Sequence, residues 1–515
     1  MSTLSVKYYE EPLLDFRYGQ QLAYPRDGLF LYGPVDGANA MPMIRYAAVG
    51  TTEGLEHLRS WSKSLNGFIA PPSKRAGAKD VEPQHVPFPG FAEAFGSEWP
   101  ARPLIERATV DRQRLREALN IGNRNEAVKK AVDLFIEPIL DATNKQEATP
   151  DFWFVVIPEE VYELGRPLSR VKPSERVRGE IAVTKQRAAF IKTNPTLWGD
   201  EEEEAEVYRY APHFRRQLKA RLLDHRVVTQ LVRETTLSPK AFINAKGVPL
   251  RKLEDPATIA WKLATACYYK AGGRPWQLSN VRDGVCYVGL VYKRDDDHPD
   301  QRYSVCAAQM FLANGEGVVF RGALGPWYRP ESKEFHLDAA SAKDLISKVV
   351  AEYKYSFGGK APRELFIHAG AAFSDEEWTG FQEASSEVAN IVGVQIHDPR
   401  DGLKLFRPGE YPVIRGTALH LNERDAYLWT AGYAPRLDTY LGPETPNPIF
   451  VSIRRGEASL NQVLRDILGL TKVNFNSCLL YNRLPVTIKF ANAIGDVLLA
   501  APTSGEPKLP FKFYI

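Results

Sequence analysis

Four polar side chains in the middle of the sequence have the types and spacing to bind an anion. Arg215 and Lys219 are four residues apart in a basic amphipathic pattern, so they share one face of a predicted helix. Gln230 follows on a predicted strand, residues 227–232, and Lys270 ends a second predicted helix. A terminal phosphate would suit this set, because it accepts several charge-assisted hydrogen bonds at once. The alternatives are a solvated basic helix and a lysine that caps its own helix.

Lys270 lies where the sequence pattern changes from helix to strand. Residues 256–271 carry apolar side chains near helical spacing, and Gly272-Gly273 can supply the positive-φ backbone that ends a helix. Residues 285–292 form a continuous apolar run, rich in β-branched and aromatic residues, of buried-strand length. One cationic helix end is therefore expected beside the first strand of a new domain.

Strand and helix patterns alternate through the first half of the chain. Residues 44–49 and 152–157 read as buried strands, and residues 110–142 as one or two helices. We expect a turn at 25–28 followed by a short strand at 29–32. The alternation predicts a doubly wound, Rossmann-like α/β domain within residues 1–278.

The second half, residues 279–515, shows a different order. Strands are expected first, then a helix, a strand, a helix and a strand, which is the order of a ribonuclease H-like fold. The expected elements are strands at 285–293, 303–311, 317–321, 364–368 and 392–396, and helices at 341–355 and 374–388.

Composition limits the class of protein. The chain has 515 residues, too many for one core, and its net charge of +3 confines any nucleic-acid surface to local patches. The four cysteines lie in apolar runs without CxxC spacing, so neither a zinc site nor a disulfide framework is expected. The N-terminus lacks a signal-peptide pattern, and no apolar stretch has the length of a membrane span. We expect a cytoplasmic protein.

Several motifs in the right order resemble short prokaryotic Argonautes, which consist of MID and PIWI domains only. The resemblance covers essentially the whole chain. Its motifs are Glu10–Phe16 with residues 25–28 at the start, Tyr269–Trp276 at the MID–PIWI junction, and Arg454–Gly456, Leu470–Ser477 and Leu484–Gly495 in the PIWI half. The resemblance implies a Rossmann-like MID domain followed by a ribonuclease H-like PIWI domain.

In this family the MID pocket binds the 5′-phosphate of a small guide strand. The resemblance places the phosphate-binding positions on Arg215, Lys219, Gln230 and Lys270, with His213 as an alternative first member. It also implies that the C-terminal carboxylate of Ile515 can help hold a Mg²⁺ ion at the same phosphate.

Slicing Argonautes hold two divalent ions with carboxylates that we expect to be replaced in this sequence. The resemblance places three of these positions on Val291, Ala369 and Asn492. Valine and alanine side chains cannot bind a hard cation, so we expect a PIWI domain that does not cut nucleic acid. The metal-capable run Asp295, Asp296, Asp297 and His298 reads as a solvated turn, and Glu376 and Glu377 as the start of a helix, where acidic residues favour the dipole.

The resemblance implies an inactive sensor. It would bind a 5′-phosphorylated guide, RNA in the leading hypothesis, and recognise complementary single-stranded DNA, with Arg454, Arg455 and Lys472 contacting phosphates. Those three could instead be ordinary surface cations. The output would come from a partner chain with an APAZ segment and a TIR, Sir2 or nuclease effector, in immunity against plasmids or phage. Target binding would switch it on, often with higher-order assembly, and a TIR or Sir2 effector would deplete NAD.

Two other classes of function stay open. The chain could be a guide-directed nuclease that uses displaced carboxylates in residues 295–300 and 375–377. It could also bind a nucleotide at Gly50–Gly54, a GTTEG turn between a strand and a helix, although that turn lacks the GxGxxG pattern.

Overall fold

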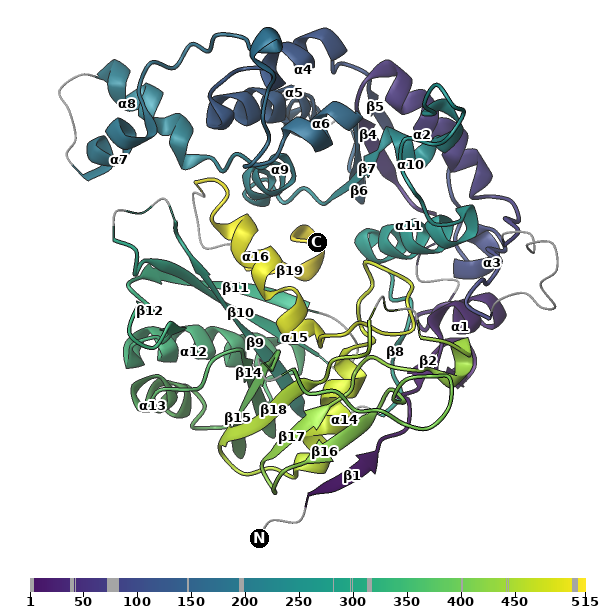
Figure 1. The fold of residues 1–515 in the computed structure, drawn as a ribbon, viewed down its shortest axis with the longest axis vertical. Coiled ribbons are helices and arrows are strands. Elements are labelled where there is room, and N and C mark those ends of the chain that lie inside the picture. The colour runs from purple at the N-terminus through teal and green to yellow at the C-terminus, as the bar shows by residue number, and fades with distance from the viewer. Residues whose placement is uncertain are drawn as a thin grey trace.

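Two units of different size make up the molecule. The computed structural model describes residues 4–37, 41, 43–71, 83–145, 148–193, 199–280, 282–296, 298, 300–312, 317–399, 402–440, 442, 444–502 and 508–515. One unit is built on a four-stranded sheet and the other on a ten-stranded sheet, and the C-terminus lies between them (Figure 1). No helix in the described part of the chain is long and apolar enough to cross a membrane.

The four-stranded sheet is entirely parallel. Its order is β5-β4-β6-β7, which comprises Ile105–Arg107, Tyr46–Val49, Phe152–Ile157 and Thr229–Arg233. Every residue of β4 and β6 is buried, and alternate side chains of β6 enter two different apolar clusters. Helices therefore cover both faces, which confirms the predicted doubly wound fold.

Several helices of this first unit begin at a residue whose side chain caps them. The side chain of Thr51 accepts the Gly54 N–H at the start of α2, and Asp255 does the same for Thr258 at the start of α11. The helices are α1 Pro25–Leu31, α2 Thr52–Ser64, α3 Phe91–Phe95, α4 Arg112–Leu119, α5 Arg124–Asn144, α6 Glu159–Leu164, α7 Lys185–Thr193, α8 Gly199–Glu206, α9 Phe214–Leu223, α10 Glu234–Leu237 and α11 Pro256–Ala271.

The ten-stranded sheet has the predicted ribonuclease H-like order. Antiparallel β9, β10 and β11 are followed by parallel β14 and β15, and helices cover parts of both faces. The sheet runs β1 Ser5–Tyr8, β16 Thr417–His420, β17 Asp425–Leu428, β18 Ile449–Arg455, β15 Asn390–His397, β14 Glu364–Ala369, β9 Val285–Arg294, β10 Ser304–Phe311, β11 Gly317–Gly325 and β19 Leu509–Pro510. The helices are α12 Ala339–Ser356, α13 Asp375–Ala384, α14 Leu460–Leu470, α15 Val486–Lys489 and α16 Ala491–Leu498. Small sheets pair β3 Gln21–Leu22, β2 Leu14–Asp15 and β8 Gln277–Leu278, and β12 Tyr328–Arg329 with β13 Glu334–Phe335.

Two details of the N-terminal segment differ from the prediction. The turn at 25–28 and the strand at 29–32 are wrong, because α1 occupies these residues. Pro25 presets the first helical φ, and the buried Arg26 guanidinium donates to the carbonyl of Cys478 at 3.0 Å. In addition, β1 pairs with β16 of the large sheet, so residues 5–8 do not belong with the 1–278 unit in which they were placed.

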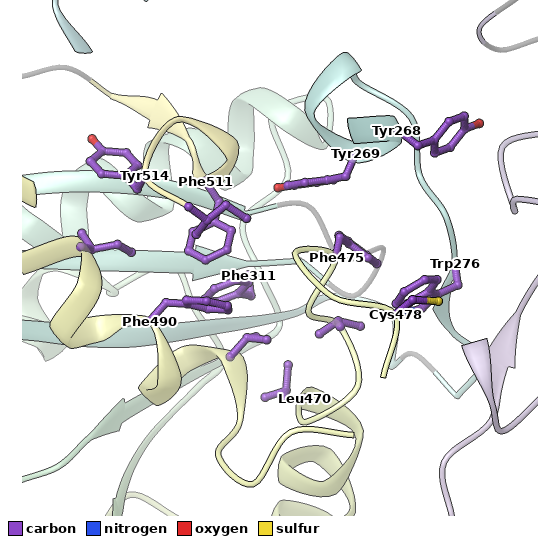
Figure 2. Packing of buried hydrophobic residues seen from close by; sticks show 14 of the residues in the cluster. Tyr268, Tyr269, Trp276, Phe311, Leu470, Phe475, Cys478, Phe490, Phe511 and Tyr514 are labelled. Carbon is purple, nitrogen blue, oxygen red and sulfur yellow. The ribbon is translucent and has the colours of Figure 1, made fainter. Parts of the chain in front are cut away.

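A shared apolar core holds the two units together. Figure 2 shows Trp276 and Tyr269, from the end of α11 and the segment after it, beside Phe475 of the loop after α14. Phe475 lies 5.2 Å from the Trp276 ring and 5.0 Å from the Tyr269 ring. Phe511 of the C-terminal tail contacts Phe311 and Phe490 at 5.5 and 4.7 Å. The tail and the end of α11 are thus fixed by the same core.

Gly289 of β9 lies where α15 presses against the sheet. A Cβ at this position would be 2.0 Å from the carbonyl oxygen of Thr487, which is backbone and cannot move aside. We expect Gly289→Ala to destabilise the protein by about 3 kcal/mol and to lower its thermal midpoint in calorimetry. Gly370→Ala is the control, because a Cβ there has no atom within 4 Å. Equal midpoints for the two variants would contradict the described packing of α15 on β9.

Candidate anion-binding site

A cavity of about 470 Å³ opens between the four-stranded sheet, α9, α11 and the C-terminal tail. The structure brings together at this cavity all six residues assigned to the phosphate pocket. They are His213, Arg215, Lys219, Gln230, Lys270 and Ile515. Although 40 positions separate Gln230 from Lys270 in the sequence, the two side chains meet because α11 ends beside β7.

Two ammonium groups meet at the base of this cavity. Lys219 Nζ donates to the main-chain oxygen of Ile515 at 2.7 Å and to the carbonyl of Thr229 at 3.3 Å. Lys270 Nζ donates to the same Thr229 carbonyl at 3.0 Å and to Gln230 Oε1 at 2.6 Å. Lys270 therefore does not cap α11. Gly272 ends that helix, with φ of 110°.

Burial shifts the charge state of this pair. Lys219 and Lys270 are 3% and 1% exposed. Burial, followed by the neighbouring Lys270 charge, places the pKa of Lys219 well below its usual range, and burial lowers the pKa of Lys270 to about 7. The described residues that line the cavity include no aspartate or glutamate side chain, and the main-chain carboxylate of Ile515, which contacts Lys219, can balance only one of the several cationic side chains there. An anion would balance the remaining positive charge.

The rim of the cavity carries further cations. The Arg215 side chain is exposed, one helical turn before Lys219. Burial, with help from Arg216 and Arg215, lowers the pKa of His213 to about 4, so the imidazole is neutral at pH 7. Arg215 thus adds charge at the opening, whereas His213 can only donate or accept a hydrogen bond.

The mouth of the cavity contains a stacked group that sequence reasoning missed. The guanidinium carbons of Arg166 and Arg233 lie 3.6 and 3.5 Å from the centroid of the Tyr162 ring, and all three residues line the cavity. Apolar side chains of β6, β7 and α11 form the wall, including Ile157, Leu231 and Leu263. Tyr162 lies in α6 and Arg166 directly follows that helix, but Arg233 comes from β7, and no local pattern links it to the other two. The cavity has polar and apolar parts, as a nucleotide requires.

The C-terminal tail is tied to the site. Lys512 Nζ donates to the carbonyl of Lys270 at 3.1 Å, and Ile515 is 3% exposed. The apolar tail is therefore anchored rather than frayed. Its position brings the last main-chain oxygen against Lys219.

The residues present do not form a Mg²⁺ site by themselves. The nearest oxygens, from Ile515 and Gln230, already accept hydrogen bonds from ammonium groups. The described residues contain no group of three or more His, Cys, Asp or Glu side chains that could hold a metal ion. Mg²⁺ at Ile515 stays a prediction, in which phosphate oxygens would have to supply most ligands.

Val291 and Ala369 lie at similar heights on neighbouring strands of the large sheet, but on opposite faces. β9 and β14 are parallel neighbours in which Gly289 pairs with His368, so Ala369 is level with Leu290, one residue before Val291. The buried Val291 packs in the apolar cluster that contains α16, and the buried Ala369 in the cluster that contains α12 and α13. Asn492 is exposed on α16. The acid nearest in sequence to Asn492 on the same helix, Asp496, is paired with Lys293 at 3.0 Å and Arg216 at 2.6 Å.

The other acidic candidates have structural partners. Asp296 pairs with Arg294 at 2.7 Å in the hairpin turn, and Asp297 lies outside the described residues. Glu376 and Glu377 begin α13, as expected, and the buried Glu377 accepts a hydrogen bond from Tyr292. The described part of this group gives no support to a displaced metal site.

Of the three cations expected to contact nucleic acid, Lys472 must be corrected. It is 1% exposed, and its ammonium group donates to Glu11 at 2.6 Å and to the carbonyl of Ala23 at 2.7 Å. It joins the N-terminal segment to the core and cannot reach a phosphate. Arg454 is exposed on β18 and donates to Gln395 at 2.8 Å, whereas Arg455 pairs with Asp375.

The GTTEG turn already holds an acid. Thr51 Oγ1 donates to Glu234 Oε1 at 2.8 Å, at the start of α2, and Glu234 is fully buried. Burial raises the pKa of this carboxyl. A nucleotide phosphate at this helix start would lie beside a carboxyl group, so the geometry does not favour nucleotide binding at Gly50–Gly54.

Comparison with solved structures shows an Argonaute-like fold. The chain is similar to Clostridium butyricum Argonaute bound to a guide DNA with a 5′ deoxycytidine and a 19-mer target DNA, at 13% identity and a TM-score of 0.57, over 99% of this chain and 55% of that one. It is similar to Aa-Ago with externally bound siRNA (14%, 0.54, 99% and 56%) and to A. aeolicus Argonaute (14%, 0.53, 98% and 54%). The chain spans about half the length of these structures. No protein-family model and no curated protein matches the sequence.

Burial of Lys270 has a cost in stability that depends on pH. The folded protein releases the proton near pH 7, whereas the unfolded chain keeps it to about pH 10. The unfolded state therefore binds more protons between these values, and the free energy of unfolding rises with pH there. We expect Lys270→Met to raise the thermal midpoint at pH 7 and to lose this advantage towards pH 10. Lys262→Met, which removes a surface ion pair with Glu254, is the control. A pH-independent difference would show that Lys270 is not desolvated.

Proposed function

We propose that the chain binds a short guide strand through its 5′-phosphate and uses it to recognise complementary single-stranded DNA. One observation carries the proposal. Lys219 and Lys270 are buried side by side, with no Asp or Glu side chain beside them, in a cavity that also has an apolar wall and a cationic rim. A terminal phosphate would balance the positive charge that the Ile515 main-chain carboxylate leaves over, and its nucleotide would pack against the apolar wall. Clostridium butyricum Argonaute, whose fold this chain shares, is bound to a guide DNA and a target DNA in its solved structure. An RNA guide is our leading choice.

We propose further that the chain does not cut the target strand. Val291 and Ala369 are buried apolar residues at the positions where the resemblance to slicing Argonautes calls for carboxylates. Arg454, linked through Gln395 to the carbonyl of Gly370, supplies positive charge near Ala369, whereas Lys293 near Val291 is paired with Asp496. Such cations can hold a phosphate backbone, but they cannot replace hydrolytic metal ions.

A sensor that does not cut needs an output from elsewhere. We infer an APAZ-containing partner with a TIR, Sir2 or nuclease effector that target binding activates, in cytoplasmic immunity against plasmids or phage and, for TIR or Sir2, through NAD depletion. The support is the resemblance of the sequence motifs to short Argonautes. Co-expression with the protein encoded beside this chain tests the inference: a stable complex whose effector responds to guide and target supports it, and a chain that binds no such protein contradicts it.

Removal of either buried lysine should weaken binding of the 5′-phosphate. We expect Lys219→Ala or Lys270→Ala to reduce affinity for a 5′-phosphorylated oligonucleotide by about 10- to 100-fold, because each removes a charged hydrogen bond. Affinity for the same strand with a 5′-hydroxyl should change little. Fluorescence anisotropy with both strands measures the preference. Lys343→Ala, which removes a surface lysine of α12 paired with Glu383, is the matched control. An unchanged preference would place the phosphate elsewhere.

The absence of cutting can be tested directly. We expect the purified chain with a 5′-phosphorylated guide, a labelled complementary target and Mg²⁺ or Mn²⁺ to leave the target intact on a sequencing gel. Guide-directed cleavage at one position, lost in an Asp295→Ala/Asp297→Ala double variant, would instead establish the alternative nuclease. Guide binding must be measured in the same samples, so that an intact target is not confused with an unloaded protein.

A further inference from the structure

The outermost strand of the ten-stranded sheet presents an open edge. Among the described strands, β1 pairs with β16 alone, and Figure 1 shows it at the margin of the molecule. Its large apolar side chains, Val6 and Tyr8, are 59% and 53% exposed, and Leu4, directly before the strand, is 63% exposed. An edge strand with this composition is a template for another strand.

The backbone of β1 is oriented for such pairing. Tyr9 N–H donates to the carbonyl of Gly416 at 2.9 Å, in line with the register of β1 on β16. Because hydrogen-bonding directions alternate along an antiparallel strand, Val6 and Tyr8 turn their N–H and C=O groups to the open side. The charge of Lys7 does not block pairing at this edge, because its Nζ is turned to α14 and donates to Asn461 at 3.2 Å.

An apolar row leads to the edge along one face of the sheet. Val6 faces Leu419, Leu419 faces Tyr427, and Tyr427 faces Phe450, so all four side chains share that face. The rings of Tyr427 and Phe450 lie 5.3 Å apart, and Leu419, Tyr427 and Phe450 are only partly buried. The opposite face belongs to the core that contains α14.

We propose that β1 pairs with β1 of a second copy of this chain, antiparallel, about a two-fold axis at Val6. This register sets Leu4 opposite Tyr8, Ser5 opposite Lys7, and Val6 opposite itself. Apolar side chains then meet on the face that carries Leu419, and no two lysines are directly opposed. The sequence Leu-Ser-Val-Lys-Tyr is symmetric in polarity about Val6, which is the property that an isologous interface requires.

The other face of the edge offers one carboxylate to a second copy. A hollow of about 730 Å³ is lined there by Ser5 and Lys7 together with Glu423, Arg424 and Glu457. Arg424 pairs with Glu457 at 3.4 Å. In the proposed register, Lys7 of the second copy stands beside Ser5 at this hollow, where its ammonium group can approach Glu423. The strand is short, so we expect a dimer that forms at micromolar concentration rather than an obligate one.

Cross-linking at the axis tests the proposal. Outward-facing residues opposed across the axis have Cα atoms about 5.5 Å apart, a distance that a disulfide spans. We expect Val6→Cys to form a covalent dimer on mild oxidation, seen on a non-reducing gel, whereas the exposed control Leu168→Cys stays monomeric. The native cysteines are all buried and free, so they add little background.

Sedimentation velocity supplies the second readout. The unmodified chain should show a concentration-dependent dimer, and Val6→Glu, which opposes two carboxylates, should weaken association by at least about tenfold. Three results would overturn the proposal: a monomer at every concentration, a dimer that Val6→Glu leaves intact, or a chain that is monomeric alone and pairs through β1 only with a different protein. The anion-binding cavity is built from elements other than β1. The Val6 variants should therefore keep their preference for a 5′-phosphate, and the test of dimer formation is independent of the test of guide binding.

Discussion

Two ammonium groups buried against one carbonyl, with no Asp or Glu side chain beside them, form the constraint on which the site depends. Such an arrangement persists only when the surrounding structure holds it, because each charge would be more stable in water. Here the small sheet supplies Thr229, α9 supplies Lys219, α11 supplies Lys270, and the tail closes the base with Ile515. Burial of the two ammonium groups lowers the stability of the free protein. A bound anion would relieve this cost, so the same burial favours anion binding. This is the pattern expected of a ligand site rather than of a structural ion pair.

The shared core explains how one cavity can use residues from both ends of the chain. Trp276, Phe475 and Phe511 lie in a single apolar cluster, so the end of α11 cannot move independently of the tail. A second link runs through Arg216 of α9, which pairs with Asp496 of α16, and Asp496 also pairs with Lys293 of β9. The cavity is therefore connected by direct contacts to the sheet end that carries Val291. A strand whose end is held in the cavity can extend towards that sheet end.

Sequence patterns predicted the helices and strands better than the tertiary contacts that their side chains make. Helical spacing placed Arg215 and Lys219 on one face, and Gly272 marked the end of α11 after Lys270, because both signals are local. The turn at 25–28 was wrong, since Pro25 is equally compatible with a turn and with the first residue of a helix. Lys472 was placed at a surface because a lone lysine carries no sign of its partner, and Glu11 lies 461 positions away. The same separation in sequence hid the contact of Arg233 with Tyr162 and the pairing of β1 with the large sheet.

The central claim concerns the location of one phosphate. A crystal structure of the chain with an oligonucleotide that carries a 5′-terminal phosphorothioate would locate the end group by the anomalous signal of its sulfur. Our account predicts a peak within hydrogen-bonding distance of both Lys219 Nζ and Lys270 Nζ, with the first nucleotide against the apolar wall of the cavity. A peak at any other site, with the two ammonium groups still bound only to Thr229, Gln230 and Ile515, would contradict it.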